Sequence, residues 1–125
     1  MFERLEREQA QIIVPSIVVS EYLTKINPNL HQAVLAEMSS RFLISSFDVR
    51  CASIAASLYT RGSEGRVRGQ ANTRNTLKAD CLIVASAKAA NATAFYTADA
   101  GCRNIAKLIM PAHDLPEMSE SIFDQ

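Results

Sequence analysis

The feature that most constrains the fold is an alternation of short apolar runs with longer stretches of helical periodicity. Strands are expected at 11–14, 42–45, 93–97 and 108–110. Helices are expected over about 17–26, 31–40, 48–60, 75–90 and 100–106. An alternation of this kind is typical of a parallel sheet with helices on both faces. The sequence therefore predicts an α/β fold.

Residues with capping chemistry mark the helix boundaries. Ser16 is expected to cap the first helix. Asn75 or Thr76 is expected to begin the long alanine-rich helix, and Asn91 to end it. Residues 61–70 contain three of the four glycines and few apolar side chains, so they are predicted to form a loop.

The composition fits one domain spanning residues 1–125. A chain of 125 residues with 48% hydrophobic residues can bury one core but not two. Lys and Arg together number 13, as do Asp and Glu, so the net charge provides no long-range attraction for nucleic acid. Binding of RNA would have to come from a local patch.

Cysteine, histidine and apolar patterns exclude several classes of protein. Cys51, Cys81 and Cys102 are odd in number and far apart, while His31 and His113 lie in unrelated segments. Neither a disulfide framework nor a Cys/His metal site is expected. No apolar run approaches about 20 residues, and the charged start lacks the apolar core of a signal peptide. We therefore expect a cytoplasmic protein with no membrane segment.

Three acidic residues adjoin segments that are predicted to be buried: Glu21, Asp80 and Asp99. The carboxyl ends of parallel strands, with the helix starts that follow them, are where α/β folds assemble ligand sites. Burying an ionised carboxylate costs several kcal/mol unless it is paired, hydrogen-bonded or metal-bound. The three residues together predict a cluster of carboxylates at one end of the sheet.

Each acid also has an ordinary structural explanation. If the helix around Asp80 begins later than residue 75, this carboxylate merely favours the helix dipole. Glu21 can form a surface ion pair with Lys25 four residues on, which is worth only tenths of a kcal/mol. Asp99 lies between a strand and a helix, where helix capping is the usual role of Asp. These alternatives stay open at the level of sequence.

The chemistry of a carboxylate cluster favours a hard cation. Oxygen ligands without histidine or thiolate suit Mg²⁺ or Mn²⁺, and such ions commonly retain waters for phosphate chemistry. A metal-bound water would have a lowered pKa, and the ion would stabilise charge on a phosphate. Phosphodiester hydrolysis is the reaction that this pattern favours.

Three segments of the chain resemble the PIN domains, especially the ribonuclease toxins of bacterial and archaeal toxin–antitoxin pairs. They are 13–23, which contains Glu21, 80–87, which begins with Asp80, and 95–99, which ends Tyr96-Thr97-Ala98-Asp99. Their order and spacing agree with that family over nearly the whole chain. The resemblance implies a three-layer α/β/α PIN-like fold with a parallel sheet.

The resemblance also implies roles for individual residues. Glu21, Asp80 and Asp99 would line a Mg²⁺ or Mn²⁺ site, and Thr97 would orient a ligand or a water. PIN domains begin with a strand that carries an Asp, and nothing before Gln11 supplies that residue here. The PIN-like domain 1–125 is therefore expected to be N-terminally incomplete and to lack one acidic ligand.

The missing strand is the central one in the PIN strand order 3-2-1-4-5. Its absence would leave 12–14 and 93–97 two strand spacings apart, roughly 9–10 Å. Either the chain is a shortened form of a longer protein, or the sheet closes up, or a partner supplies a strand. An intact five-stranded sheet formed by residues 1–125 alone would contradict this expectation.

Two functions follow as hypotheses. The first is a PIN-type metal-dependent endoribonuclease, a toxin that hydrolyses RNA and has an antitoxin partner. The alternative is a catalytically impaired PIN-like protein that acts as an RNA- or protein-interaction module. A homodimer is expected in either case, and apolar residues such as Leu23, Ile26, Leu30 and Leu35 are expected to be core.

Basic residues near the predicted loop are the candidates for RNA contact. They are Arg61, Arg66, Arg68, Arg74 and Lys78. The only acidic residue in that stretch is Glu64, so the stretch forms a local positive patch. Guanidinium planes can engage phosphates or stacked bases, whereas the ordinary reading of such a stretch is a solvated loop.

Overall fold

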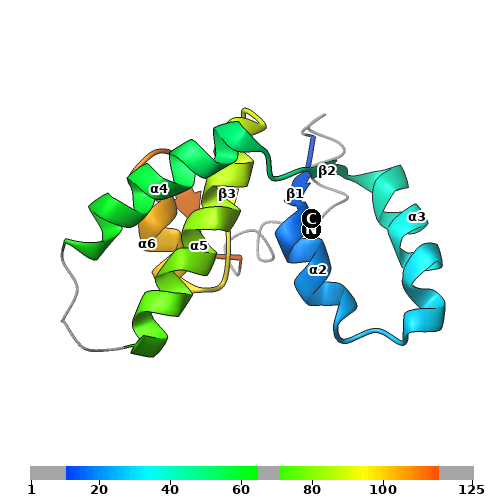
Figure 1. The fold of residues 1–125 in the computed structure, drawn as a ribbon. Helices are drawn as coiled ribbons and strands as arrows, with labels where there is room; N and C mark the ends of the chain where they lie inside the picture. Colours follow the sequence, from blue (N-terminus) through cyan, green and yellow to red (C-terminus); the bar gives the residue numbers. More distant parts are fainter. Residues whose placement is uncertain (1–10, 65–70, 116–125) are drawn as a thin grey trace.

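The computed structural model describes residues 11–64 and 71–115, which form short strands and longer helices (Figure 1). The elements in chain order are β1 (Ile13–Pro15), α2 (Ser16–Leu23), the 3-10 helix η1 (Pro28–Leu30), α3 (His31–Arg41), β2 (Leu43–Ser45), α4 (Val49–Ser63), α5 (Ala71–Ala89), β3 (Phe95–Tyr96), α6 (Ala100–Ala106) and β4 (Ala112–His113). This α/β order agrees with the prediction.

The described strands form two parallel pairs. In one sheet β1 pairs with β2, with Ile13 opposite Leu43, and in the other β3 pairs with β4, with Phe95 opposite Ala112. Each sheet has two strands, so residues 11–64 and 71–115 do not form one continuous sheet. In the PIN strand order 3-2-1-4-5, these two pairs would lie on either side of the central strand. The described strands do not pair with one another across that position.

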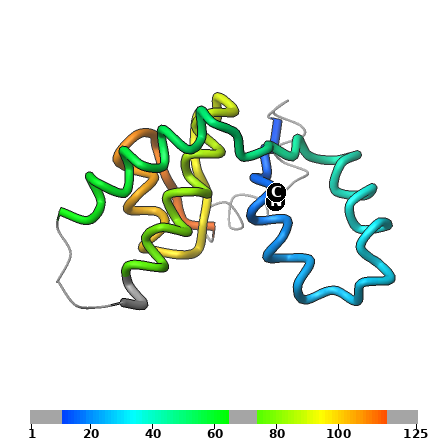
Figure 2. Tube along the Cα trace, viewed as in Figure 1, coloured from blue at the N-terminus to red at the C-terminus, as the bar shows by residue number. Residues whose placement is uncertain are grey.

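The two pairs belong to two halves of the molecule (Figure 2). One half contains β1, α2, α3 and β2, and the chain then crosses to α4, which packs against α5. The described core cluster lies entirely in this second half: Ala55, Leu58, Leu77, Cys81, Val84, Ala85, Ala87, Phe95, Cys102, Ile105, Ala106, Met110 and Ala112. β1 reaches this half through its contacts with α5.

Side-chain caps and a left-handed residue fix several helix ends. Asp48 precedes α4, and its carboxylate accepts a hydrogen bond of 3.1 Å from the backbone N–H of Cys51. Asn91 has a φ of 67°, a conformation that Asn tolerates better than most residues and that ends α5. The predicted stop at Asn91 is confirmed.

Other predicted boundaries are wrong. Pro15, and not Ser16, holds the cap position of α2, because its φ of −61° and extended ψ lead directly into the helix. α2 ends at Leu23, short of the predicted residue 26. α5 begins at Ala71, so neither Asn75 nor Thr76 caps it. The final described strand is Ala112–His113, because the N–H groups of residues 108–110 donate to the carbonyl oxygens of Ile105 and Ala106 and so continue the turn of α6.

The predicted loop at 61–70 is partly helical. α4 continues through Arg61 and Gly62 to Ser63, and residues 65–70 lie outside the described part of the chain. A Cβ on Gly62 would lie 2.8 Å from Ile105 Cδ1 and 3.1 Å from Leu77 Cδ1. A larger residue here would make the ends of the Ile105 and Leu77 side chains shift, so this glycine lies at a close contact inside a helix and does not mark a turn.

The described residues also bear on the cysteines and on membrane-spanning segments. Cys51, Cys81 and Cys102 are buried and none is disulfide-bonded. Across 11–64 and 71–115, no helix is long and apolar enough to cross a bilayer.

Candidate metal centre

Asp80 lies deep in α5 and faces the core. Nine residues of helix precede it, which rules out the alternative that it merely begins the helix. Only 7% of its surface is exposed, and Leu77 and Val84, one turn away on either side, are buried too. Asp80 is thus a buried carboxylate on an apolar helix face, as predicted.

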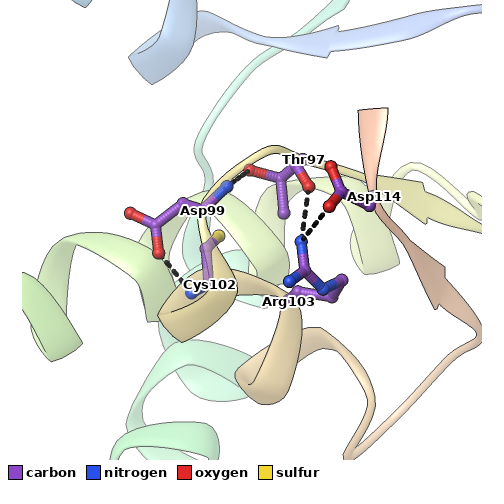
Figure 3. A network of polar contacts seen from close by, with 5 residues as sticks. All are labelled: Thr97, Asp99, Cys102, Arg103 and Asp114. Atoms are coloured by element: carbon purple, nitrogen blue, oxygen red, sulfur yellow. Dashed lines mark hydrogen bonds and ion pairs between the residues drawn. The ribbon is translucent and has the colours of Figure 1, made fainter. Parts of the chain in front are cut away.

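Asp99 lies at the start of α6 and caps it. Its Oδ1 accepts a hydrogen bond of 3.0 Å from the backbone N–H of Cys102. Its own N–H donates to Thr97 Oγ1 at 3.1 Å, so the loop before the helix is closed by a side chain (Figure 3). The capping role of Asp99 is confirmed. The cap uses Oδ1, and the second carboxylate oxygen takes no part in it.

Gly101 brings the two carboxylates into one space. A Cβ placed on Gly101 would lie 3.2 Å from Asp99 Oδ1 and 3.8 Å from Asp80 Oδ2. Oxygen atoms from α5 and from the start of α6 therefore converge on the bare Cα of this glycine. This is the acidic pair that the structure provides.

Cys102 contacts both members of the pair. Burial raises the pKa of its thiol to about 12, and the negative charges of Asp80 and Asp99 and a hydrogen bond to the Asp80 carboxylate act in the same direction. The thiol is therefore protonated at neutral pH and donates to Asp80, while the backbone N–H donates to Asp99. One residue thus holds both carboxylates.

Arg103 fixes the loop from the other side. Its Nη1 donates to the carbonyl oxygen of Thr97 at 3.0 Å and lies 3.7 Å from Asp114 Oδ2 (Figure 3). The Thr97 N–H in turn donates to the carbonyl oxygen of His113 at 3.1 Å, next to β4. Thr97 therefore has its hydroxyl, N–H and carbonyl engaged in holding the position of Asp99.

Glu21 does not join this pair. It lies near the end of α2 with an exposed side chain. In the described part of the chain, no three His, Cys, Asp or Glu side chains are grouped closely enough to hold a metal ion. Two of the three predicted carboxylates are thus brought together, and the ligand role of Glu21 remains a prediction.

Three of the five basic residues that are predicted to contact RNA lie in the described part of the chain. Arg61 donates from Nη2 to the Leu108 carbonyl oxygen at 3.3 Å, and the Lys78 ammonium lies 5.6 Å from the centre of the Tyr59 ring. Arg74 is exposed on α5. Arg66 and Arg68 lie outside the described residues.

Sequence reasoning missed Gly101, Cys102 and Arg103. Cys102 had a detectable signal, since it stands three residues after a capping Asp and its N–H is the expected donor to that cap. Gly101 had none, because its proximity to Asp80 depends on how α6 packs against α5. Arg103 lies beside Asp114, directly after β4, and the sequence predicted that strand at 108–110.

The fold and the acidic pair describe an α/β domain with a carboxylate site at the start of a helix, and comparisons identify its family. The model of the PIN domain matches residues 2–108, so this chain belongs to the PIN domain family. A solved structure, VapBC2 from Rickettsia felis bound to a DNA fragment from their promoter, is similar with a TM-score of 0.61 and 23% identity. The match covers 90% of this chain and 83% of that one. None of the curated proteins compared with the chain matches it significantly.

A hard divalent cation fits the residues that are present. Mg²⁺ commonly takes one or two protein carboxylates and keeps waters for its other positions. Asp80 and Asp99 offer oxygen donors around a position without a side chain. Both donors are carboxylate oxygens, the ligand type that suits a hard cation.

Proposed function

We propose that this PIN-domain protein is a metal-dependent endoribonuclease that hydrolyses RNA phosphodiester bonds and serves as the toxin of a toxin–antitoxin pair. The observation that supports it most is the convergence of Asp80 and Asp99 on Gly101. A carboxylate in a helix and another after a parallel strand, brought close together, are suited to phosphate chemistry with a divalent cation. Membership of the PIN family supplies the class of reaction.

In this proposal Asp80 and Asp99 hold Mg²⁺ or Mn²⁺, with Glu21 as the third carboxylate that the resemblance implies. The bound ion supplies an activated water and stabilises charge on the phosphate. Cys102 orients both carboxylates through its thiol and its N–H. Thr97 and Arg103 fix the loop that carries Asp99, so that its second oxygen stays available.

The substrate is proposed to be RNA, bound through Arg61, Arg66, Arg68, Arg74 and Lys78. Of these, Arg74 and Lys78 are exposed on the same helix as Asp80, six and two residues before it. Exposed cations of this kind neutralise phosphates and so position a nucleic acid on the surface. The contacts that Arg61 and Lys78 make in the structure are weak surface contacts that RNA could replace.

The partners are proposed to be an antitoxin and a second copy of this chain. The similar structure from Rickettsia felis is a VapBC2 assembly bound to promoter DNA. Several apolar side chains of the first half are available for such contacts, including Tyr22, Leu30 and Leu43. An antitoxin that covers this half would explain why apolar surface is exposed there.

A second candidate function is a non-catalytic interaction module. It is favoured by one observation, namely that the described residues contain no group of three potential metal ligands. A domain whose two carboxylates bind a cation only weakly could still bind RNA or protein through its other surfaces. The two candidates differ in whether the acidic pair is needed for chemistry.

The deciding experiment is cleavage of a panel of structured and single-stranded RNAs with Mn²⁺, with Mg²⁺ and with chelator. The variants are Asp80→Asn and Asp99→Asn, which remove each charge with little change of size, and at position 99 Asn can still cap the helix. Asp48→Asn is the matched control, since Asp48 also caps a helix through the N–H of a cysteine. Metal-dependent cutting that is lost in the first two variants and kept in the third is expected. Cutting that survives both substitutions, or no cutting by the folded parent, would contradict the proposal.

A further inference from the structure

We propose that Tyr96, supported by His113, forms a surface on which one unpaired base of single-stranded RNA stacks. This inference rests on the proposed function and deepens it, because it names a residue that positions the substrate through a base. Tyr96 was not among the residues expected to contact RNA. It is the last residue of β3, directly before the loop that leads to Asp99.

The β3–β4 sheet has one buried face and one accessible face. Phe95 and Ala112, which lie opposite each other, are 9% and 8% exposed and belong to the core cluster. Because successive side chains of a strand point to opposite faces, the neighbouring pair of Tyr96 and His113 lies on the other face. Tyr96 is 40% exposed there. The accessible face of this sheet therefore presents an aromatic pair.

The two rings of this pair hold each other in place. Their centroids lie 5.1 Å apart and their planes are inclined by 32°, a separation usual for aromatic pairs. The strands beneath them are fixed by two backbone hydrogen bonds. The Phe95 N–H donates to the Pro111 carbonyl oxygen at 2.9 Å, and the Thr97 N–H donates to the His113 carbonyl oxygen at 3.1 Å. The Tyr96 ring is thus positioned before a ligand arrives, which lowers the entropic cost of binding.

The chemistry of this surface favours a base. Unpaired bases of RNA stack on aromatic side chains, and RNA-binding sheets commonly present such rings from their strands. Tyrosine adds a hydroxyl and histidine adds ring nitrogens, which can hydrogen-bond to the polar edge of a base. By contrast, the exposed Leu30 and Leu43 of the first half offer only aliphatic surface. The Tyr96–His113 pair is therefore better suited to a nucleotide than those side chains are.

The position along the chain links this surface to the acidic pair. Asp99 follows Tyr96 by three residues, so their Cα atoms are no more than about 11 Å apart, given the reach of an extended chain. Thr97, which lies between them, holds the loop through its hydroxyl and its carbonyl oxygen (Figure 3). A nucleotide whose base stacks on Tyr96 is thereby held close to Asp99.

The test measures the affinity of the full chain for two fluorescent single-stranded oligomers of equal length, in chelator so that neither is cut. One oligomer carries uracil bases, and the other is abasic and keeps only the sugar–phosphate backbone. We expect the parent to bind the uracil oligomer more tightly. Tyr96→Ala should lose about 5–150-fold in affinity for it, as is typical of one lost base–aromatic stack. Its affinity for the abasic oligomer should not change.

Three further variants complete the experiment. Tyr96→Phe keeps the ring and should retain most of the preference for the uracil oligomer. Tyr22→Ala removes a tyrosine that is 50% exposed on α2, in the other half, and should bind both oligomers as the parent does. Tyr96→Leu, which keeps apolar bulk without a ring, replaces Tyr96→Ala if the latter melts below the assay temperature. Sedimentation of each variant gives its oligomeric state.

The outcomes separate this inference from the proposed function. Equal affinity of the parent for the two oligomers, or an unchanged preference in Tyr96→Ala, would overturn the stacking surface and leave the proposed nuclease standing. A changed oligomeric state of Tyr96→Ala with the preference retained would show instead that a second copy covers this face. A parent chain that binds neither oligomer would overturn RNA as the substrate together with this inference. A preference that depends on Tyr96 in a chain that cuts no RNA would support the stacking surface and contradict the nuclease.

Discussion

The two halves of the molecule contain the same kinds of elements but differ in how they are packed. Residues 11–45 contain two strands and two α-helices, yet only Pro15 and Val19 are buried. Residues 49–115 hold the whole core cluster, including Leu58, Leu77 and Val84. A strand–helix pattern in the sequence therefore predicts the elements, whereas the burial of their side chains depends on what those elements pack against.

Close packing of helices explains the second half. α4 and α5 lie against each other through small residues such as Ala55 and Ala85, which let the helix backbones approach. α5 also contacts α6, which carries Asp99 at its start. Asp80 and Asp99 are therefore positioned by the best-packed part of the chain.

The first half lacks an equivalent partner. Leu23, Ile26, Leu30 and Leu35 were expected to be core, but Leu30 is 55% exposed and the others are only partly buried. Its strands pair with each other and leave one edge of β1 without a neighbour in the described sheets. Glu21 lies in this half, which is why it is separated from the acidic pair.

The largest expected difference comes from truncating one leucine in each half, buried in the second half and exposed in the first. Leu77→Ala should lower the free energy of unfolding by about 2–5 kcal/mol, because Leu77 is 1% exposed and its removal leaves a cavity. Leu30→Ala should change it by less than about 0.5 kcal/mol, as is usual for exposed positions. Urea denaturation measures both values. Similar losses in the two variants would break the comparison between the halves.

The next effect is the response of stability to Mn²⁺. At a concentration of one hundred times its dissociation constant, a bound ion would stabilise the parent by about 2.7 kcal/mol. Asp80→Asn should lose most of this gain, while Glu21→Gln tests whether the exposed carboxylate contributes. Thermal melting with and without Mn²⁺ gives the shifts. If Asp80→Asn and the parent shift equally, the acidic pair is not a cation site.

A smaller effect is expected at the helix caps. Asp99→Ala should cost about 0.5–2 kcal/mol because the Cys102 N–H loses its acceptor, whereas Asp99→Asn should cost little. Asp48→Ala should behave similarly, since its cap has the same geometry. Denaturation in metal-free buffer separates capping from metal binding. A much larger cost for Asp99→Asn than for Asp48→Asn would show that the Asp99 charge stabilises the fold itself.

The smallest effect is the pH dependence contributed by Asp48. The hydrogen bonds from Cys51 hold the pKa of this carboxyl below its usual value of 3.8. A carboxyl with a lowered folded pKa stabilises the fold above its unfolded pKa, and this contribution is lost as the pH falls through the folded pKa. Asp48→Asn should therefore flatten the stability profile slightly below about pH 4. An unchanged acid limb of the profile would argue against this cap.

Local signals predicted part of this structure well. The bounds of α6, the cap at Asp99 and the stop at Asn91 follow from residues within one turn of each boundary. Gly62 misled the prediction, because its role is set by Ile105 and Leu77, which are distant in sequence. The convergence of Asp80 with Asp99 was expected from strand order, but Gly101 between them was not. The described strands form two separate pairs, while the single, N-terminally incomplete domain 1–125 remains a prediction.

The most direct test of the central claim is an NMR titration of the isotope-labelled chain with Mn²⁺. A paramagnetic ion broadens the signals of nuclei close to it, so the position of the site is read without any assay of activity. We predict that the amide signals of Asp80, Asp99, Gly101 and Cys102 disappear first, and that Asp80→Asn abolishes this selectivity. Broadening that begins elsewhere, or that spreads evenly over the exposed carboxylates, would contradict the assignment of the metal centre.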